Sequence, residues 1–253
     1  MDTPRLRAQV EETCMNAWPA LKDVFYDGWL IRLARGATRR TNSVNVIGPG
    51  RRPLAEKIEY CEAIYRAHAQ PSYFRILSDA SPELEEALDS RGYRAEDETL
   101  TLYMNFRRHP PPRPAAAIPV DVHEGRPPRD WLAAHTRHSR RTPDEARALH
   151  AILDVLAVPA FFAEARDGDD NIASVAFCGI HENLACVQWV VTDPEQRRTG
   201  LSRATLSALL TRAQAAGAVG ACLQVLATNV SAIRLYERLG FTCELYRYHY
   251  RVR

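Results

Sequence analysis

The fold is decided by one stretch in the last third of the chain, Val190-Val191-Thr192-Asp193-Pro194-Glu195-Gln196-Arg197-Arg198-Thr199-Gly200-Leu201-Ser202. Residues 184–192 are apolar and rich in valine, and Asp193-Pro194 follows them, which predicts a buried strand that ends at the proline. Residues 203–216 carry leucines at helical spacing. The stretch therefore predicts a strand, a tight basic turn and a helix.

The turn between this strand and helix has the chemistry of an anion site. The first backbone N–H groups of a helix have no partner within the helix, and they carry partial positive charge. Gly200 lets a ligand approach the backbone closely, and Arg197 and Arg198 lie beside it. An ordinary strand-to-helix connection with solvated arginines fits the same pattern, so the turn alone leaves phosphate binding open.

A second stretch follows another predicted strand, residues 221–226. It reads Asn229-Val230-Ser231-Ala232-Ile233-Arg234-Leu235-Tyr236-Glu237-Arg238-Leu239-Gly240-Phe241. Asn229 or Ser231 can cap the start of a helix, and Gly240 can end it in the left-handed conformation. The sequence therefore predicts a short helix that is capped at both ends.

Together the two stretches resemble the GNAT family, the acetyl-CoA-dependent N-acetyltransferases. Arg197-Arg198-Thr199-Gly200-Leu201-Ser202 resembles the family pattern Q/R-x-x-G-x-G/A, with Ser202 where the family prefers Gly or Ala. Asn229, Ala232, Leu235, Tyr236, Gly240 and Phe241 match the family pattern N-x-x-A-x-x-L-Y-x-x-x-G-F. The resemblance implies the GNAT fold, an α/β fold of the α+β type in which helices flank a mixed central sheet.

The resemblance also implies a binding site for acetyl-CoA as co-substrate, without a metal. The pyrophosphate is expected on the backbone amides from Arg198 to Ser202, and the pantetheine is expected beside the end of the preceding strand. The implied cofactor-binding residues are Val190, Val191, Thr192, Arg197, Arg198, Thr199, Gly200, Leu201, Ser202, Arg203, Asn229, Ala232 and Tyr236.

Acetyl transfer to an amine needs groups that stabilise the oxyanion, protonate the leaving thiolate and deprotonate the amine. An amide of the strand before the loop takes the first role in the family. Tyr236 matches the family's general acid, although a tyrosine there can also simply pack the helix. Many members use a glutamate on that strand as the base, but this chain has Gln188, which cannot accept a proton. Glu182 in a predicted hairpin turn is the candidate base, with His181, Glu164 and a water chain as alternatives.

Composition limits the other classes of function. A chain of 253 residues permits one large or two small domains, and a net charge of +2 gives no sign of a nucleic-acid or membrane surface. The sequence shows no apolar signal core and no run long enough to cross a bilayer. The six cysteines are scattered without a C-x-x-C pair, which suits a reducing cytoplasm and argues against a zinc site. The oligomeric state stays open.

The first hundred residues repeat the element order of the end of the chain. Residues 54–70 predict a helix, residues 73–77 a strand, and residues 84–91 a second helix that ends at Gly92. Gly92 takes the place of the glycine in the second motif. Gly50-Arg51-Arg52-Pro53 precedes the first of these helices and lacks the small residues of a pyrophosphate loop. This half resembles a degenerate copy of the same fold, with a generic α/β domain as the alternative.

The proline-rich segment His109-Pro110-Pro111-Pro112-Arg113-Pro114-Ala115-Ala116-Ala117 predicts a semi-rigid spacer. We therefore expect a degenerate GNAT-like domain over residues 1–108, a linker over 109–117 and an acetyltransferase domain over 118–253. The expected activity is transfer of an acetyl group from acetyl-CoA to a primary amine of a small molecule or peptide by direct attack. A non-catalytic CoA-binding or regulatory module and an acyltransferase that uses a longer acyl-CoA are the alternatives.

Overall fold

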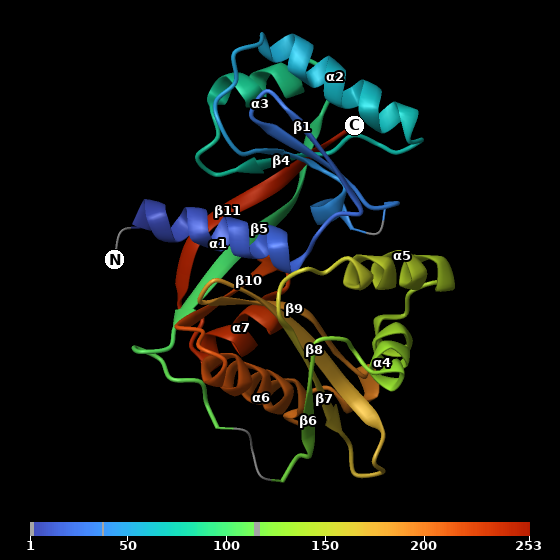
Figure 1. The fold of residues 1–253 in the computed structure, drawn as a ribbon, viewed down its shortest axis with the longest axis vertical. Helices are drawn as coiled ribbons and strands as arrows, with labels where there is room; N and C mark the ends of the chain where they lie inside the picture. Colours follow the sequence, from blue (N-terminus) through green and yellow to red (C-terminus); the bar gives the residue numbers. More distant parts are fainter. Residues whose placement is uncertain (1–2, 37, 114–116) are drawn as a thin grey trace. The chain divides into compact units, whose positions relative to one another are not determined.

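The computed structural model describes residues 3–36, 38–113 and 117–253, so part of the expected linker, residues 114–116, lies outside the described residues. The chain divides into two compact units (Figure 1). Unit 1 comprises Met1–Trp18, Thr101–Val225 and Asn229–Leu245, and unit 2 comprises Pro19–Leu100, Leu226–Thr228 and Tyr246–Arg253. No helix of the described residues combines the length and apolar character that a bilayer crossing requires.

Unit 2 contains a sheet with two helices packed against it. Its elements are β1 (Lys22–Tyr26), β2 (Trp29–Leu33), the 3-10 helix η1 (Arg39–Thr41), β3 (Val44–Val46), α2 (Leu54–Ala67), β4 (Phe74–Leu77) and α3 (Pro82–Asp89). The strand order is β1-β2-β3-β4-β11-β5, where β5 is Arg94–Asn105 and β11 is Cys243–Val252. Ile31, Ile58, Phe74 and Leu88, from β2, α2, β4 and α3, belong to one buried apolar cluster. Burial of this cluster holds both helices on the sheet.

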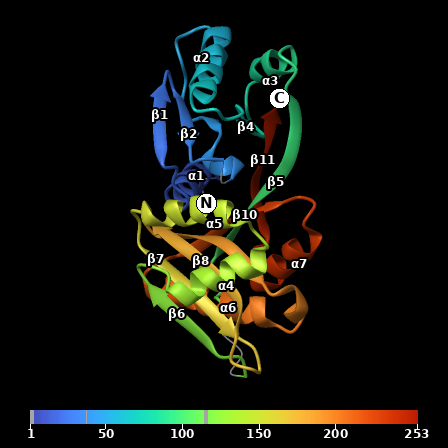
Figure 2. The ribbon, with the colours of Figure 1, turned by 90° about the vertical axis from the view of Figure 1, so that its right-hand side faces the viewer.

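Unit 1 has the element order that the resemblance implies. Its elements are α1 (Thr3–Ala17), β6 (Val120–Glu124), α4 (Arg129–Ser139), α5 (Pro143–Asp154), β7 (Ala160–Arg166), β8 (Ile172–His181), β9 (Leu184–Thr192), the 3-10 helix η2 (Pro194–Gln196), α6 (Leu201–Ala215), β10 (Gly220–Leu226) and α7 (Val230–Leu239) (Figure 2). Strands β6 to β9 pair antiparallel, and β9 pairs parallel with β10. The predicted mixed sheet flanked by helices is thus confirmed.

Helices cover both faces of the unit 1 sheet. Helix α6 packs on β6 to β9, whereas α1 and α4 pack on β8 and β9. Ala165 of β7 packs with Leu201 of α6. Phe162 of the same strand packs edge-on against Trp131 of α4, with 5.3 Å between the ring centroids. Because side chains of a strand alternate between its two faces, α6 and α4 lie on opposite faces of the sheet.

The sequence did not predict two of the strands. Strands β1 and β6 each have five residues, and neither has a fully buried residue along its length. Each strand lies at one end of the strand order. A half-exposed edge strand keeps charged residues such as Lys22, Asp23 and Asp121, which hide the apolar alternation used to recognise a strand.

Two long strands contribute residues to both units. Strand β5 supplies residues from Thr101 onward to unit 1, where it neighbours β10, and β11 supplies residues from Tyr246 onward to unit 2, where it pairs with β4. Helix α1 also belongs to unit 1, on β8 and β9. The compact units therefore differ from the expected boundaries at 1–108 and 118–253. Strands of 12 and 10 residues exceed the usual five to six, so each is long enough to serve both units.

Candidate functional site

Strand β9 carries a β-bulge at Trp189. Strand β8 pairs Val175 with Val191 but Phe177 with Gln188, so β9 has one residue more than β8 between these pairs. Trp189 has a φ of +53°, in the left-handed region that bulky residues rarely adopt. Bulges of this kind redirect the backbone of a strand and occur often beside active sites.

The parallel pairing of β9 with β10 ends just before the bulge. It runs from Leu184 opposite Gly220 to Val187 opposite Leu223, although β9 itself continues to Thr192. The last part of β9 therefore presents backbone groups on the side where β10 no longer pairs with it. An extended ligand that carries amides can bind such groups as an added strand does.

The turn after β9 opens the N-terminus of α6. Asp193 caps η2 by accepting a hydrogen bond from the Glu195 amide at 3.0 Å. Arg198 and Gly200 then adopt left-handed φ values of +66° and +95°. Gly200 is the N-cap residue of α6, and no side chain caps the helix there. Arg197, Arg198 and Gly200 are exposed, so the first amides of α6 and two guanidinium groups lie where an anion can reach them.

Ser202 ties this turn to the sheet. Its hydroxyl lies 2.6 Å from Thr192 Oγ1, which in turn lies 2.9 Å from Ser174 Oγ. The three hydroxyls link β8, the end of β9 and the first turn of α6. Serine at the position where the family prefers Gly or Ala is thus compatible with the turn and adds a contact that neither residue could make.

Helix α7 is capped as its sequence predicts. The Asn229 side chain accepts a hydrogen bond from the Ala232 amide at 3.2 Å. Gly240 has a φ of +108°, and the Phe241 amide donates to the Tyr236 carbonyl at 3.0 Å. The Tyr236 side chain is buried, with its ring edge-on to Phe241 at 6.1 Å. Asn229 therefore holds the helix start, and α7 fixes the position of Tyr236.

The two carboxylates considered as bases differ in their position relative to the bulge: Glu182 lies seven residues before Trp189, whereas Glu164 pairs with Val175, which pairs with Val191 of β9. Glu182 is in the β8–β9 turn, where it accepts a hydrogen bond from Gln9 Nε2 at 2.9 Å. Because a strand rises about 3.3 Å per residue, Glu182 and Trp189 are about 20 Å apart. Glu164 on β7 is buried and accepts a hydrogen bond from Arg166 Nη2 at 2.8 Å. The structure therefore does not bring Glu182 and the bulge together.

An aromatic cluster that the sequence analysis missed surrounds Trp189. Its ring stacks on His135 of α4 at 4.1 Å and meets Trp18 edge-on at 4.9 Å. Burial lowers the pKa of His135 to about 3, so the imidazole is neutral at neutral pH. A neutral ring beside the bulge does not repel an ammonium group. The cluster has no sequence signature, because its members come from separate segments.

The corresponding turn in unit 2 is filled by a carboxylate of the chain itself. Asp27 accepts hydrogen bonds from the amides of Arg51 and Arg52, both at 2.9 Å, and its carboxylate lies 3.4 Å from Lys57 Nζ. The hydrogen bond from the Arg52 amide is the largest of the effects that lower the pKa of Asp27 to about 2. A Cβ on Gly50 would lie 2.4 Å from the Asp27 carboxylate. Unit 2 thus holds an internal anion where unit 1 has an open helix start.

Comparison with known proteins shows the family of this chain. Residues 3–252 match the family model described as "Probable histone acetyltransferase Rv0428c C-terminal". The chain is 23% identical over 246 residues to "Uncharacterized N-acetyltransferase YobR" of Bacillus subtilis, covering 97% of this chain and 98% of that protein. It is also 35% identical over 82 residues to the ribosomal protein bS18-alanine N-acetyltransferase of Salmonella typhimurium. This match covers 32% of this chain and 55% of that protein.

Solved structures agree on the fold. A GCN5-related N-acetyltransferase from Kribbella flavida superposes with a TM-score of 0.71 at 17% identity, over 100% of this chain and 95% of that one. A tandem GNAT protein from the clavulanic acid biosynthesis pathway gives 0.68 at 14% identity, over 83% and 74%. Because the family model spans nearly the whole chain, this acyltransferase belongs to the GNAT family, in the group that the Rv0428c C-terminal model describes.

Proposed function

We propose that the protein transfers the acetyl group of acetyl-CoA to a primary amine of a small molecule or peptide by direct attack. One observation carries this proposal. The bulge at Trp189 and the glycine-capped helix start at Gly200 belong to a single strand–turn–helix unit. The backbone at the bulge can bind the thioester and the pantetheine as an added strand does. The open helix start at Gly200 can bind the pyrophosphate.

The proposed cofactor contacts follow from this unit. The pyrophosphate would lie on the amides from Arg198 to Ser202, where exposed guanidinium groups can add charge-assisted hydrogen bonds. The pantetheine would pair with the end of β9. The residues assigned to the cofactor are Val190, Val191, Thr192, Arg197, Arg198, Thr199, Gly200, Leu201, Ser202, Arg203 and Tyr236, with Asn229 and Ala232 holding the start of α7.

The reaction needs three proton and charge adjustments. The amine nitrogen attacks the thioester carbon, and an amide of β9 at the bulge stabilises the oxyanion that forms. The carbon–sulfur bond then breaks, and the Tyr236 hydroxyl protonates the departing thiolate. The amine gives its proton to a water chain that leads to bulk solvent. The distance of Glu182 from the bulge and the hydrogen bond of Glu164 to Arg166 favour water over either carboxylate.

Peptide N-termini belong among the candidate acceptors. A relative over part of this chain is named for acetylation of an alanine of ribosomal protein bS18. The neutral His135 stacked on Trp189 is compatible with a cationic acceptor on the α4 face of the sheet. We further propose that the N-terminal half, expected over residues 1–108 and centred on unit 2, is a degenerate copy of the acetyltransferase domain, although α1 and the end of β5 belong to unit 1. We also propose that the enzyme works in the cytoplasm.

A thiol-release screen with acetyl-CoA tests the proposed activity. Amino acids, polyamines, aminoglycosides and peptides with free N-termini are offered in turn, and we expect at least one class to give thiol and N-acetylated product in equal amounts. Mass spectrometry of the product identifies the acetylated nitrogen. CoA binding without amine-dependent thiol release in any class would favour the non-catalytic module. Faster thiol release from a longer acyl-CoA than from acetyl-CoA would indicate that the longer acyl-CoA is the donor.

Titration with CoA is expected to give one site per chain. The Asp27 carboxylate already accepts hydrogen bonds from the amides of Arg51 and Arg52, so this turn of unit 2 is closed to a pyrophosphate. Isothermal calorimetry gives the number of sites directly. A second site would contradict this prediction, and variants in the cavity of about 490 Å³ lined by Trp29 and Lys57 would test whether CoA binds there.

A further inference from the structure

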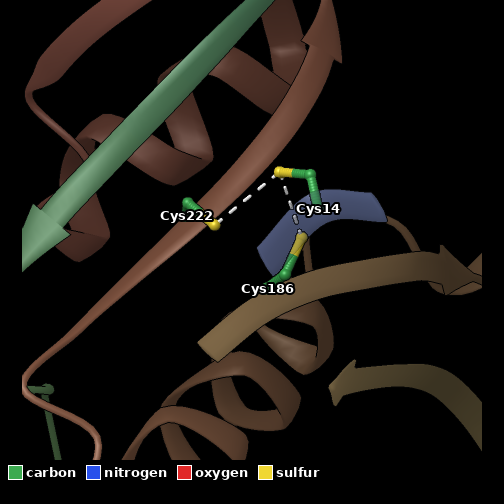
Figure 3. Close-up of side chains that lie close together, drawn as sticks. All are labelled: Cys14, Cys186 and Cys222. Carbon is green, nitrogen blue, oxygen red and sulfur yellow. Dashed lines mark hydrogen bonds between the residues drawn. The ribbon is translucent and has the colours of Figure 1, made fainter. Parts of the chain in front are cut away.

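Three buried cysteines of unit 1 converge on one point (Figure 3). They come from three separate elements: Cys14 from α1, Cys186 from β9 and Cys222 from β10. The Sγ atom of Cys14 lies 3.6 Å from that of Cys186 and 3.9 Å from that of Cys222. All three sulfur atoms lie within 4.8 Å of one another.

The fold builds this arrangement from the backbone. Cys186 and Cys222 are directly opposite each other on the parallel strands β9 and β10, so both side chains point to the same face of the sheet. Gly179 of β8 pairs with Cys186, and a Cβ on Gly179 would lie 2.7 Å from the Cβ of Ala17. The glycine therefore lets α1 lie close to this face, where Cys14 meets the other two thiols.

We propose that this cysteine triad binds one thiophilic metal ion, and that the ion is one satisfied by three sulfur ligands, such as Cu(I). With metal–sulfur bonds of about 2.3 Å, three sulfurs in a trigonal plane lie about 4.0 Å apart. The two separations that involve Cys14, 3.6 and 3.9 Å, are close to that value, and all three sulfurs lie within 4.8 Å of one another. The ligands are already near their bound positions, so little rearrangement opposes binding.

The ligand set selects the ion. Structural zinc sites almost always have four ligands. Among the described residues, the group contains three cysteines and no histidine or carboxylate. Gln188 Nε2 lies 3.1 Å from the Cys186 sulfur and can donate a hydrogen bond to a thiolate. Soft thiolate ligands without a fourth donor favour Cu(I) over zinc.

An ion bound by the triad would lie close to the bulge at Trp189. Cys186 lies on β9 shortly before Trp189, and Trp18, the residue directly after α1, packs edge-on against Trp189 with 4.9 Å between the ring centroids. The ion would link α1 to β9 and β10 just before the bulge, where β9 still pairs with β10. We therefore expect occupancy of the triad to stabilise unit 1 against unfolding, since a ligand that binds only the folded state adds its binding free energy.

Anaerobic titration of the reduced full chain with Cu(I) tests the proposal. Cu(I) is delivered from a competing chelator, and native mass spectrometry counts the ions. All proteins carry Cys243→Ala, because Cys243 is an exposed thiol that would bind copper by itself. We expect one ion per chain and a higher melting temperature. Cys14→Ala or Cys222→Ala should weaken binding by about 100-fold or more, since even outer-shell partners of metal ligands contribute 10- to 100-fold.

Cys178→Ala is the matched control. Cys178 is fully buried on the neighbouring strand β8, but it pairs with Val187 and so points to the opposite face from Cys186. This variant should keep the full affinity. Each variant must retain CoA binding in the absence of copper, and Cys→Ser replaces any Cys→Ala that fails to fold. Absence of binding, binding that survives loss of Cys14 or Cys222, or zinc binding as tight as Cu(I) binding would overturn the proposal.

Discussion

The Gly200→Glu protein is expected to fold and to lose CoA binding. Gly200 is the N-cap residue of α6, and its amide and those after it form the proposed pyrophosphate site. Glutamate there places a negative charge beside the phosphates, and close like charges cost several kcal/mol. Because each 1.4 kcal/mol is about tenfold in affinity, the dissociation constant should rise by about 100-fold or more. Calorimetric titration with CoA measures the change.

A control substitution at Gly217 separates the effect of the added charge from the effect of backbone strain. Gly200 and Gly217 both have left-handed φ values, +95° and +97°, but Gly217 follows the C-terminal end of α6. A side chain at either position pays the same left-handed penalty of about 1–2 kcal/mol. A carboxylate is also favoured at the N-terminus of a helix and disfavoured at its C-terminus. Gly217→Glu should therefore lower the melting temperature at least as much as Gly200→Glu while leaving CoA affinity unchanged. A folded Gly200→Glu protein with unchanged affinity would place the pyrophosphate elsewhere.

The parts of the fold that depend on local sequence could be predicted. The strand at Leu184–Thr192 was expected at its observed bounds, because a valine-rich run ends at Asp193-Pro194. The caps of α7 were also expected at Asn229 and Gly240. The Asn229 side chain bonds to an amide three residues later, and Gly240 adopts the left-handed conformation at the end of the helix. Such features need only neighbours in the chain, so a single sequence carries them.

Features that depend on distant pairing could not be predicted. The bulge at Trp189 is a mismatch of register between β8 and β9, and no local pattern around it records which residues of β8 lie opposite. The cysteine triad joins Cys14, Cys186 and Cys222, whose wide separation in the chain led the sequence analysis to expect no metal. The contact of Asp27 with Arg51 and Arg52 likewise joins the β1–β2 turn to the loop between β3 and α2, which are about 25 residues apart in the chain.

Tyr236→Phe is expected to lower turnover without loss of the fold. The tyrosine ring is buried and packs edge-on against Phe241, and phenylalanine keeps this packing. Loss of the hydroxyl removes the proposed donor to the CoA thiolate. A positioned general acid is worth about 10²- to 10⁴-fold, so kcat should fall by about 100-fold or more. The KM for acetyl-CoA should change little, since the proton is needed only as the carbon–sulfur bond breaks.

Tyr103→Phe controls for the loss of a buried hydroxyl in the same unit. Tyr103 of β5 is buried, its hydroxyl accepts a hydrogen bond from Asn105 at 3.3 Å, and it faces Gly220 at the paired start of β10. Its removal should lower the melting temperature slightly and leave kcat unchanged. Steady-state rates are measured with an acceptor from the thiol-release screen, under conditions where chemistry limits turnover. A Tyr236→Phe enzyme with a kcat equal to that of Tyr103→Phe would make Tyr236 a packing residue, and the thiolate would then take its proton from solvent.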